Sequence, residues 1–161
     1  MVAASAGNHA QGVALAAQTL GIQATIFVPL GIPVPKLLAT RSYGAEVVLE
    51  GETVATSLRL AAEFAERTGA VIIHPFDHRD VVIGQGTLGL ELLEDAPDVD
   101  TIVLGIGGGG LIAGVAAAVK AKAAELGRSV RIIGVQAENA AAMIPSLAVS
   151  YTHLTLPTIC S

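Results

Sequence analysis

Short runs rich in β-branched residues alternate along the chain with longer, alanine-rich segments in which apolar positions recur at helical spacing. Runs such as Thr25-Ile26-Phe27-Val28 are apolar on both faces, which is typical of strands in a parallel sheet. The pattern predicts strands at Val2–Ala4, Ala24–Val28, Glu46–Leu49, Val71–Ile73, Thr101–Leu104 and Arg131–Val135. It predicts helices at His9–Leu20, Val34–Tyr43, Thr53–Thr68, Asp80–Glu94, Gly110–Leu126 and Asn139–Ser146.

Glycines support these boundaries. Gly21, Gly44, Gly69 and Gly127 each follow a predicted helix, where the left-handed backbone that commonly ends a helix favours glycine. The regular alternation of strand and helix predicts an α/β fold, in which doubly wound, twisted parallel sheets carry helices on both faces. In such folds, ligands bind at the loops that lead from the carboxyl ends of strands into helices.

Both ends of the chain differ from what the interior pattern leads one to expect. Residues 149–161 contain no glycine and no alanine, and they resemble a translation of the adapter DNA used in sequencing libraries. We therefore predict that residues 150–161 are a non-native tail. Met1 leads straight into a strand pattern, which indicates that the chain is cut at this end as well. A polar, proline-containing segment, residues 74–80, is the expected junction between two lobes.

The composition excludes several classes of function. Apolar residues make up 52% of the 161 residues and charged residues 14%, so the chain has ample apolar surface to bury and is not disordered. Aromatic residues are only 3% and the net charge is −5. Nucleic-acid binding is disfavoured, because it relies on aromatic faces for base stacking and on basic residues for phosphates.

Metal sites, disulfides and membrane spans are not predicted. Cys160 is the single cysteine, and the four histidines show no metal-binding spacing. Thr101–Val119 is an uncharged run of 19 residues, but its glycines favour a strand, a turn and a helix over a membrane span. The uncharged segment Met1–Pro35 lacks the basic start of a signal peptide. We therefore expect a cytoplasmic protein without a metal.

The first predicted strand leads into a helix through the loop around Ser5 and Asn8. Backbone N–H groups at the start of a helix have no partner within the helix and carry partial positive charge, so they bind anions such as carboxylates. Serine and asparagine are also common helix caps. The spacing alone leaves both interpretations open.

A second such loop carries four consecutive glycines, Gly107 to Gly110, before Leu111. Glycines at this density let backbone amides curl around an oxyanion, most often a phosphate. Gly105, Gly107 and Gly110 also match the G-x-G-x-x-G spacing of dinucleotide-binding domains. The acidic residue expected about 20 positions further on is replaced by Gln136, which weakens that interpretation.

The chain resembles the threonine dehydratase (threonine ammonia-lyase) branch of the fold-type-II pyridoxal-phosphate enzymes over residues 2 to about 148. The motifs that carry the resemblance are Ser5-Ala6-Gly7-Asn8-His9-Ala10-Gln11-Gly12, His74-Pro75-Phe76-Asp77, Gly84-Gln85-Gly86-Thr87 and the glycine run before Leu111. It implies a two-lobed enzyme, with residues 1–76 in a residual small, substrate-side lobe and residues 77–149 in part of a large cofactor-binding lobe.

The resemblance also assigns site residues. It implies that Gly107, Gly108, Gly109 and Gly110, with Leu111, cradle the phosphate of pyridoxal 5′-phosphate. It implies that the side-chain amide of Asn8 meets the 3′-oxygen of the cofactor, and that Ser5, Ala6, Gly7 and His9 bind the substrate carboxylate. The parent protein is then expected to be a homo-oligomer that acts on a small amino acid. The motif Gly84–Thr87 is assigned only a structural role.

The catalytic residue is expected outside the chain. In this family, the lysine that holds the cofactor as a Schiff base precedes the Ser-Ala-Gly-Asn loop, and no lysine here stands at that position. Lys36, Lys120 and Lys122 match no family position and are expected to be solvated. We therefore assign no catalytic residue within this chain, and we expect the chain by itself to be inactive.

Within the family, the residues favour deamination of L-threonine, and secondarily of L-serine, to a 2-oxo acid and ammonia. The relative to distinguish is serine racemase, which uses a serine as an acid where this chain has Ala6, and which binds a metal through carboxylates just after the strand that matches Ile132–Val135. Glu138 is the single acid of residues 136–142. The alternatives are serine racemase or another fold-type-II enzyme, a dinucleotide-binding oxidoreductase, or a module that only binds. Isoleucine biosynthesis and threonine catabolism remain equally open.

Overall fold

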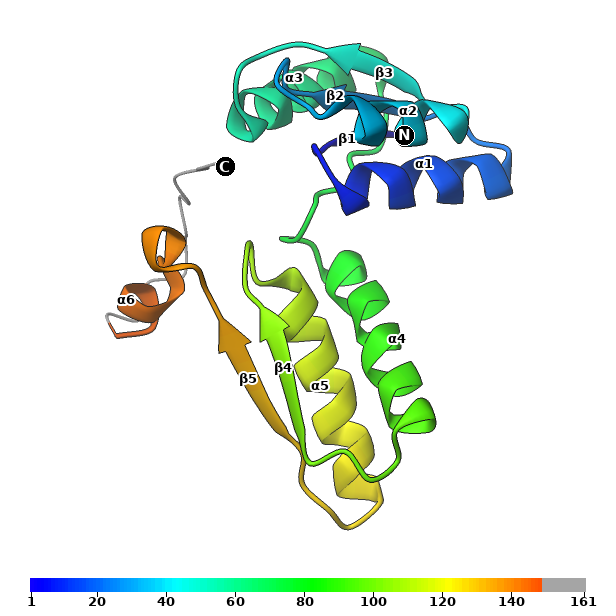
Figure 1. Cartoon of the computed structure of the whole chain (residues 1–161). Coiled ribbons are helices and arrows are strands. Elements are labelled where there is room, and N and C mark those ends of the chain that lie inside the picture. The colour runs from blue at the N-terminus through cyan, green and yellow to red at the C-terminus, as the bar shows by residue number, and fades with distance from the viewer. Residues whose placement is uncertain (149–161) are drawn as a thin grey trace. The chain divides into compact units, whose positions relative to one another are not determined.

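The computed structural model describes residues 1–148, and the chain divides into two compact units (Figure 1). Unit 1 comprises Met1–Pro75, and unit 2 begins at Phe76. The proposed tail, residues 150–161, lies outside the described residues. Each unit is a parallel α/β structure, so the predicted fold class is confirmed.

Unit 1 contains a three-stranded parallel sheet in the order β1-β2-β3. Its elements are β1 (Val2–Ala4), α1 (Asn8–Leu20), β2 (Thr25–Val28), α2 (Val34–Ser42), β3 (Glu46–Leu49) and α3 (Val54–Thr68). The strand predicted at Val71–Ile73 is reduced to one parallel bridge, between Val2 and Ile72. This segment is held beside β1 by two backbone bonds, Val2 N–H to Val71 O and Ile73 N–H to Val2 O, each 2.8 Å long.

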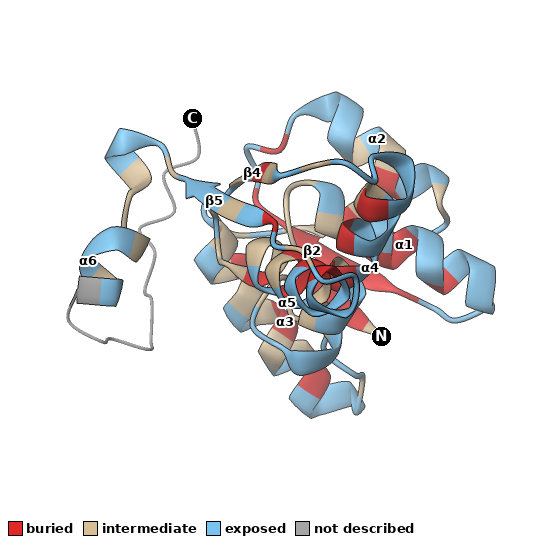
Figure 2. Ribbon diagram, turned by 90° about the horizontal axis from the view of Figure 1, so that it is seen from below, coloured by how far each residue is buried: buried red, intermediate tan, exposed pale blue. Residues whose placement is uncertain are grey.

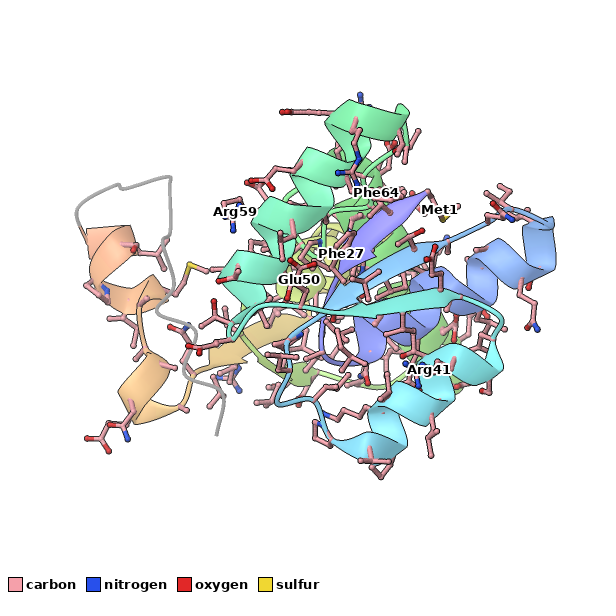
Figure 3. All side chains as sticks on the ribbon, turned by 90° about the horizontal axis from the view of Figure 1, so that it is seen from above. Met1, Phe27, Arg41, Glu50, Arg59 and Phe64 are labelled. Atoms are coloured by element: carbon pink, nitrogen blue, oxygen red, sulfur yellow. The ribbon has the colours of Figure 1, made fainter. Side chains whose placement is uncertain are left out.

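Alternate side chains of the unit 1 sheet enter two different clusters, one on each face. All four residues of β2 are buried (Figure 2). Ala3, Ile26 and Val28 pack with the alanine-rich face of α1. On the opposite face, Phe27 packs with α3, where its ring meets the edge of Phe64 at a centroid distance of 5.7 Å (Figure 3). Because both faces are covered, β1 and residues Ile26 to Val28 of β2 are apolar without alternation, as the sequence pattern indicates.

Unit 2 contains a two-stranded parallel sheet that helices cover on one face. Its elements are α4 (Arg79–Asp95), β4 (Thr101–Gly105), α5 (Gly110–Glu125), β5 (Arg131–Val135), the 3₁₀ helix η1 (Glu138–Ala140) and α6 (Met143–Ala148). Ile102 packs in one cluster with Val115 and Val119 of α5. On the other face, Val103 and Val135 are 59% and 51% exposed. Within the described residues, this second face of the sheet is therefore left open to solvent.

The helix predicted at Asn139–Ser146 is also wrong. The structure has η1 and then a separate short helix, α6, which starts at Met143. The reason is Pro145, whose ring would clash with the carbonyl of Ala141 if the helix ran continuously from Asn139. A start at Met143 places the proline in the first turn, where its missing N–H costs nothing.

The uncharged run Thr101–Val119 is divided between β4 and α5, as the sequence predicts. Four residues, 106–109, separate the two elements. Among residues 1–148 there is no helix with both the length and the hydropathy needed to cross a membrane.

Helices α4 and α5 lie side by side (Figure 1), and glycines allow their backbones to approach closely. A Cβ atom at Gly86 would lie 3.2 Å from the carbonyl oxygen of Gly114. A Cβ atom at Gly114 would lie 2.8 Å from the amide nitrogen of Gly86 and would overlap the carbonyl of Val82. The structural role predicted for the Gly84–Thr87 motif is thus visible at Gly86.

This contact predicts opposite effects for two glycine substitutions. Gly114→Ala forces a methyl group against the α4 backbone, and we expect it to destabilise the chain by about 1–3 kcal/mol. Gly84→Ala, on the exposed side of α4 with no atom within 4 Å of the added Cβ, is the matched control. It should stabilise by about 0.5–1 kcal/mol. Urea unfolding followed by circular dichroism measures both, and an unchanged midpoint for Gly114→Ala would contradict this packing.

Candidate functional site

The first candidate loop, residues 5–7, joins β1 to α1 in unit 1. The first bond of the helix runs from Gln11 N–H to the carbonyl of Gly7. The amides of Asn8, His9 and Ala10 therefore lie at the open amino end of α1, where partial positive charge favours an anion. The amide of Ser5 donates to the carbonyl of Phe27 at 3.2 Å, which ties the start of the loop to β2.

Neither Ser5 nor Asn8 caps this helix. The N-cap residue is Gly7, and no side chain makes a capping hydrogen bond there. The hydroxyl oxygen of Ser5 instead accepts from the amide of Gly7 at 3.1 Å, which braces the turn before the helix. Asn8 is the first helical residue, and its side chain is exposed. The capping interpretation is therefore wrong, and the exposed side chain of Asn8 has no role in starting this helix.

His9 is half-buried, and its ring is bonded to the backbone of unit 1. Its Nε2 lies 2.9 Å from the carbonyl oxygen of Ile73, so Nε2 carries the proton and donates. Burial lowers the pKa of His9, and the bond to Ile73 offsets part of that effect. The ring is thus neutral at physiological pH. The backbone N–H of His9, rather than its Nε2, is the group left to meet an anion.

The second candidate loop, residues 106–109, leads from β4 into α5 in unit 2. The N-cap residue is Gly109, with a left-handed φ of 92°, and the first helical bond runs from Ala113 N–H to the Gly109 carbonyl at 3.0 Å. The amides of Gly110, Leu111 and Ile112 therefore lie at the open end of α5. This arrangement forms a ready site for a phosphate.

The four glycines of this loop have different structural reasons. Gly109 is required by its positive φ. A Cβ at Gly108 would overlap the ring of Phe76, and a Cβ at Gly110 would lie 2.7 Å from the Phe76 carbonyl oxygen. A Cβ at Gly107 would meet nothing within 4 Å, so the fold does not require glycine there. Gly107 therefore faces space that no described residue fills.

Two residues that the sequence analysis names but does not assign to a site hold this loop in place. The ring and backbone of Phe76 lie directly against Gly108 and Gly110. The side chain of Gln136 donates from Nε2 to the carbonyl of Ile106 at 3.3 Å and accepts the amide of Met143 at 2.9 Å. The sequence did draw attention to the position of Gln136, directly after β5. A dinucleotide-binding domain would carry an acidic residue there to bind the ribose, and this chain has an amide instead.

The remaining predicted features concern lysines and metals. Lys36, Lys120 and Lys122 are all exposed, as expected for solvated side chains, and Lys122 pairs with Glu125 at 2.9 Å. That ion pair raises the pKa of Lys122. Over residues 1–148, no group of three or more His, Cys, Asp or Glu side chains is arranged to hold a metal ion.

Parallel α/β units whose strand-to-helix loops present open backbone amides define a class of proteins that bind phosphates and carboxylates. Comparison with models of known protein families identifies one family within this class. Residues 1–160 match the family described as pyridoxal-phosphate dependent enzymes, and the chain belongs to this family. The G-x-G-x-x-G spacing at Gly105, Gly107 and Gly110 is thus part of a pyridoxal-phosphate family sequence and gives no support to a dinucleotide.

Three relatives show which members of this family the chain is similar to. The chain is 53% identical to the L-threonine ammonia-lyase of Thermotoga maritima, over 91% of this chain and 36% of that protein. The processed form of threonine deaminase isoform 2 from Solanum lycopersicum is 43% identical with a TM-score of 0.84, covering 94% of this chain and 43% of that one. Maize serine racemase is 39% identical with a TM-score of 0.86, covering 98% and 46%. The chain thus spans less than half the length of these relatives.

The partial burial of His9 makes stability depend on pH. Because the pKa of folded His9 lies below its ordinary value of 6.5, the unfolded chain takes up this proton at a higher pH than the folded chain. The contribution of His9 is complete above pH 6.5 and is lost as the pH falls through the lower pKa of the folded state. His9→Gln keeps a donor for Ile73 but cannot titrate, so this variant should lose less stability on acidification.

Urea unfolding of both proteins at about pH 7.5 and about pH 5 measures this difference, because those values bracket an ordinary histidine titration. An NMR titration of the His9 ring measures the pKa directly. Equal losses of stability in both proteins, or a pKa above 6.5 for His9, would contradict a pKa lowered by partial burial.

Proposed function

We propose that the longer protein to which this chain corresponds is a pyridoxal-phosphate-dependent lyase that deaminates L-threonine, and secondarily L-serine, to a 2-oxo acid and ammonia. The observation that carries the proposal is the 53% identity to a threonine ammonia-lyase across 91% of this chain. Both amide-lined loops fall within that span. Residues 1–76 serve as part of the substrate-side lobe and residues 77–149 as part of the cofactor-side lobe.

The glycine loop is the proposed phosphate site. The amides of Gly107 to Gly110 and of Leu111 hold the phosphate of the cofactor, and the partial positive charge at the start of α5 stabilises its negative charge. The open space at Gly107 supports this assignment, because a side chain there would occupy the room of the ligand. Phe76 and Gln136 keep the loop in its conformation.

The first loop is the proposed substrate site. Backbone amides between Ser5 and His9 bind the substrate carboxylate at the start of α1, and the Ser5 hydroxyl keeps the Gly7 amide in position. The exposed side-chain amide of Asn8 donates to the 3′-oxygen of the cofactor. When bound, pyridoxal phosphate supplies an electron sink for the charge left on the α-carbon when its proton is removed. The lysine expected to accept that proton precedes Ser5 in the family, so the present chain contributes binding and orientation.

Deamination is preferred to racemisation because of Ala6. A racemase needs a second acid on the opposite face of the substrate, and a methyl group has no proton to give. The described residues 136–142 also offer one carboxylate, Glu138, which is too few for a divalent metal site. The similarity to maize serine racemase supports a shared fold, while the higher identity to the threonine ammonia-lyase supports the reaction.

We expect a cytoplasmic homo-oligomer that acts on a small amino acid, without a metal and without nucleic acid, in either isoleucine biosynthesis or threonine catabolism. The low aromatic content and the net charge of −5 support the exclusion of nucleic acid.

The reaction is tested with the full-length protein loaded with pyridoxal phosphate. We expect 2-oxobutanoate from L-threonine and pyruvate from L-serine, with turnover unchanged by a chelator such as EDTA. The 161-residue chain under the same conditions should form neither product. Accumulation of D-serine in place of pyruvate would favour the racemase alternative, and formation of neither product would refute the proposed function.

The phosphate site is tested by Gly107→Asp in the 161-residue chain. The substitution meets no protein atom within 4 Å of its Cβ, so the fold should remain intact, whereas Gly108→Asp would disturb Phe76. A carboxylate a few ångströms from a phosphate should weaken the binding of inorganic phosphate or pyridoxal phosphate by at least about tenfold.

Equilibrium dialysis measures this affinity. Gly31→Asp, which adds the same charge in unit 1 with similar open space, is the matched control and should bind as the unmodified chain does. Gly107→Ala separates steric from electrostatic effects. If Gly107→Asp binds phosphate normally, the glycine loop is not the cradle.

A further inference from the structure

The segment that joins the two units is fastened at each end to one of the two candidate loops. In unit 1, the carbonyl of Ile73 accepts the Nε2 proton of His9, the second residue of the helix that follows the first loop. In unit 2, Phe76 lies against the glycine loop. Only His74 and Pro75 separate these two attachment points.

The joining segment is conformationally restricted. Proline fixes its own φ, and the residue before a proline is confined to extended conformations. Ile73 is further held by its amide, which donates to the carbonyl of Val2 at 2.8 Å. We call residues 73–76 the strap; its backbone is restricted at His74 and Pro75.

The attachment in unit 2 involves both the ring and the backbone of Phe76. A Cβ at Gly108 would overlap the ring, and a Cβ at Gly110 would lie 2.7 Å from the Phe76 carbonyl oxygen and 2.9 Å from its Cα. Contacts this close leave no free space between Phe76 and the glycine loop. A displacement of Phe76 therefore requires a change in the loop, because packed groups do not deform continuously.

The strap is attached to the first loop by a half-buried hydrogen bond between the His9 ring and the Ile73 carbonyl. His9 donates through Nε2 to a carbonyl that belongs to the strap. The backbone of His9 lies at the open amino end of α1, next to Asn8. The same residue thus contacts the strap through its ring and the proposed substrate loop through its backbone.

We propose that residues 73–76 couple the two loops, with His9 and Phe76 as positioning residues at the two ends of the strap. Ordering one loop restrains the strap and thereby favours the ordered conformation of the other, and this coupling is reciprocal. The assignment of the two loops as ligand sites rests on the proposed function. The mechanical coupling itself requires no ligand.

Amide hydrogen exchange of the ¹⁵N-labelled 161-residue chain tests the coupling without ligand. The amide of Ile73 reports on the strap in unit 1, and the amide of Ala113, bonded to Gly109, reports on the glycine loop in unit 2. We expect Phe76→Ala to accelerate exchange at Ile73, and His9→Leu to accelerate exchange at Ala113. Each effect should be about fivefold or more, the size expected when one hydrogen bond is lost from a local opening equilibrium.

Conservative variants separate positioning from general destabilisation. His9→Gln retains a donor for Ile73, and Phe76→Leu retains apolar bulk against the loop, so both should exchange at nearly the rate of the unmodified chain. The helix-interior amides of Ala17 and Val119 serve as references for each unit. If Phe76→Ala accelerates exchange at Ile73 no more than at Ala17, or if His9→Leu leaves Ala113 unchanged, the coupling is overturned.

Inorganic phosphate distinguishes this proposal from the proposed function. If phosphate binds the glycine loop, it should slow exchange at Ala113 and also at Ile73, and the second effect should disappear in Phe76→Ala. Protection of Ala113 without protection of Ile73 would refute the strap and leave the phosphate site standing. A third outcome is that phosphate protects neither amide while Phe76→Ala and His9→Leu still accelerate exchange at the distant loop; that result would support the strap and refute the phosphate site.

Discussion

Each of the two candidate loops depends on one constraint of the α-helix, namely that its first amides have no acceptor within the helix. In α1 the first helical bond starts at Gln11, and in α5 it starts at Ala113, so each helix presents a cluster of open N–H groups. The parallel sheets place these clusters directly after strands β1 and β4. The rest of each unit, with its buried alanines and close glycine contacts, serves to hold those helix ends in place.

The glycine loop shows how one run of identical residues can satisfy several requirements. Gly109 supplies a left-handed turn, and Gly108 and Gly110 make room for Phe76. Gly107 is the position that the protein's own packing leaves open. Neither a positive φ nor a close contact explains Gly107, so its role as a ligand contact stays a prediction. The same logic separates Gly114, which the α4 backbone requires, from Gly84, which it does not.

Side chains near the two loops are largely used to support backbone groups. Ser5 braces Gly7, His9 donates to Ile73, and Gln136 bridges Ile106 and Met143. This allocation fits a family in which a cofactor supplies much of the reactivity and the protein supplies binding and orientation. It also explains why Asn8, exposed and without a capping role, stands out among the polar residues of the first loop.

The sequence by itself determined the order of strands and helices, the two glycine-bearing loops and the family, because periodicity and helix ends are local properties of the chain. The sequence pattern predicted a strand at Val71–Ile73, where pairing with β1 is limited to one bridge. It also predicted one continuous helix across Pro145, where the structure has two separate elements. Only the tertiary structure decided that Gly7 rather than Ser5 or Asn8 is the N-cap, that His9 binds the Ile73 carbonyl, and that Phe76 packs on the glycine loop. These contacts join residues up to 64 positions apart, and local patterns carry no information about such distant partners.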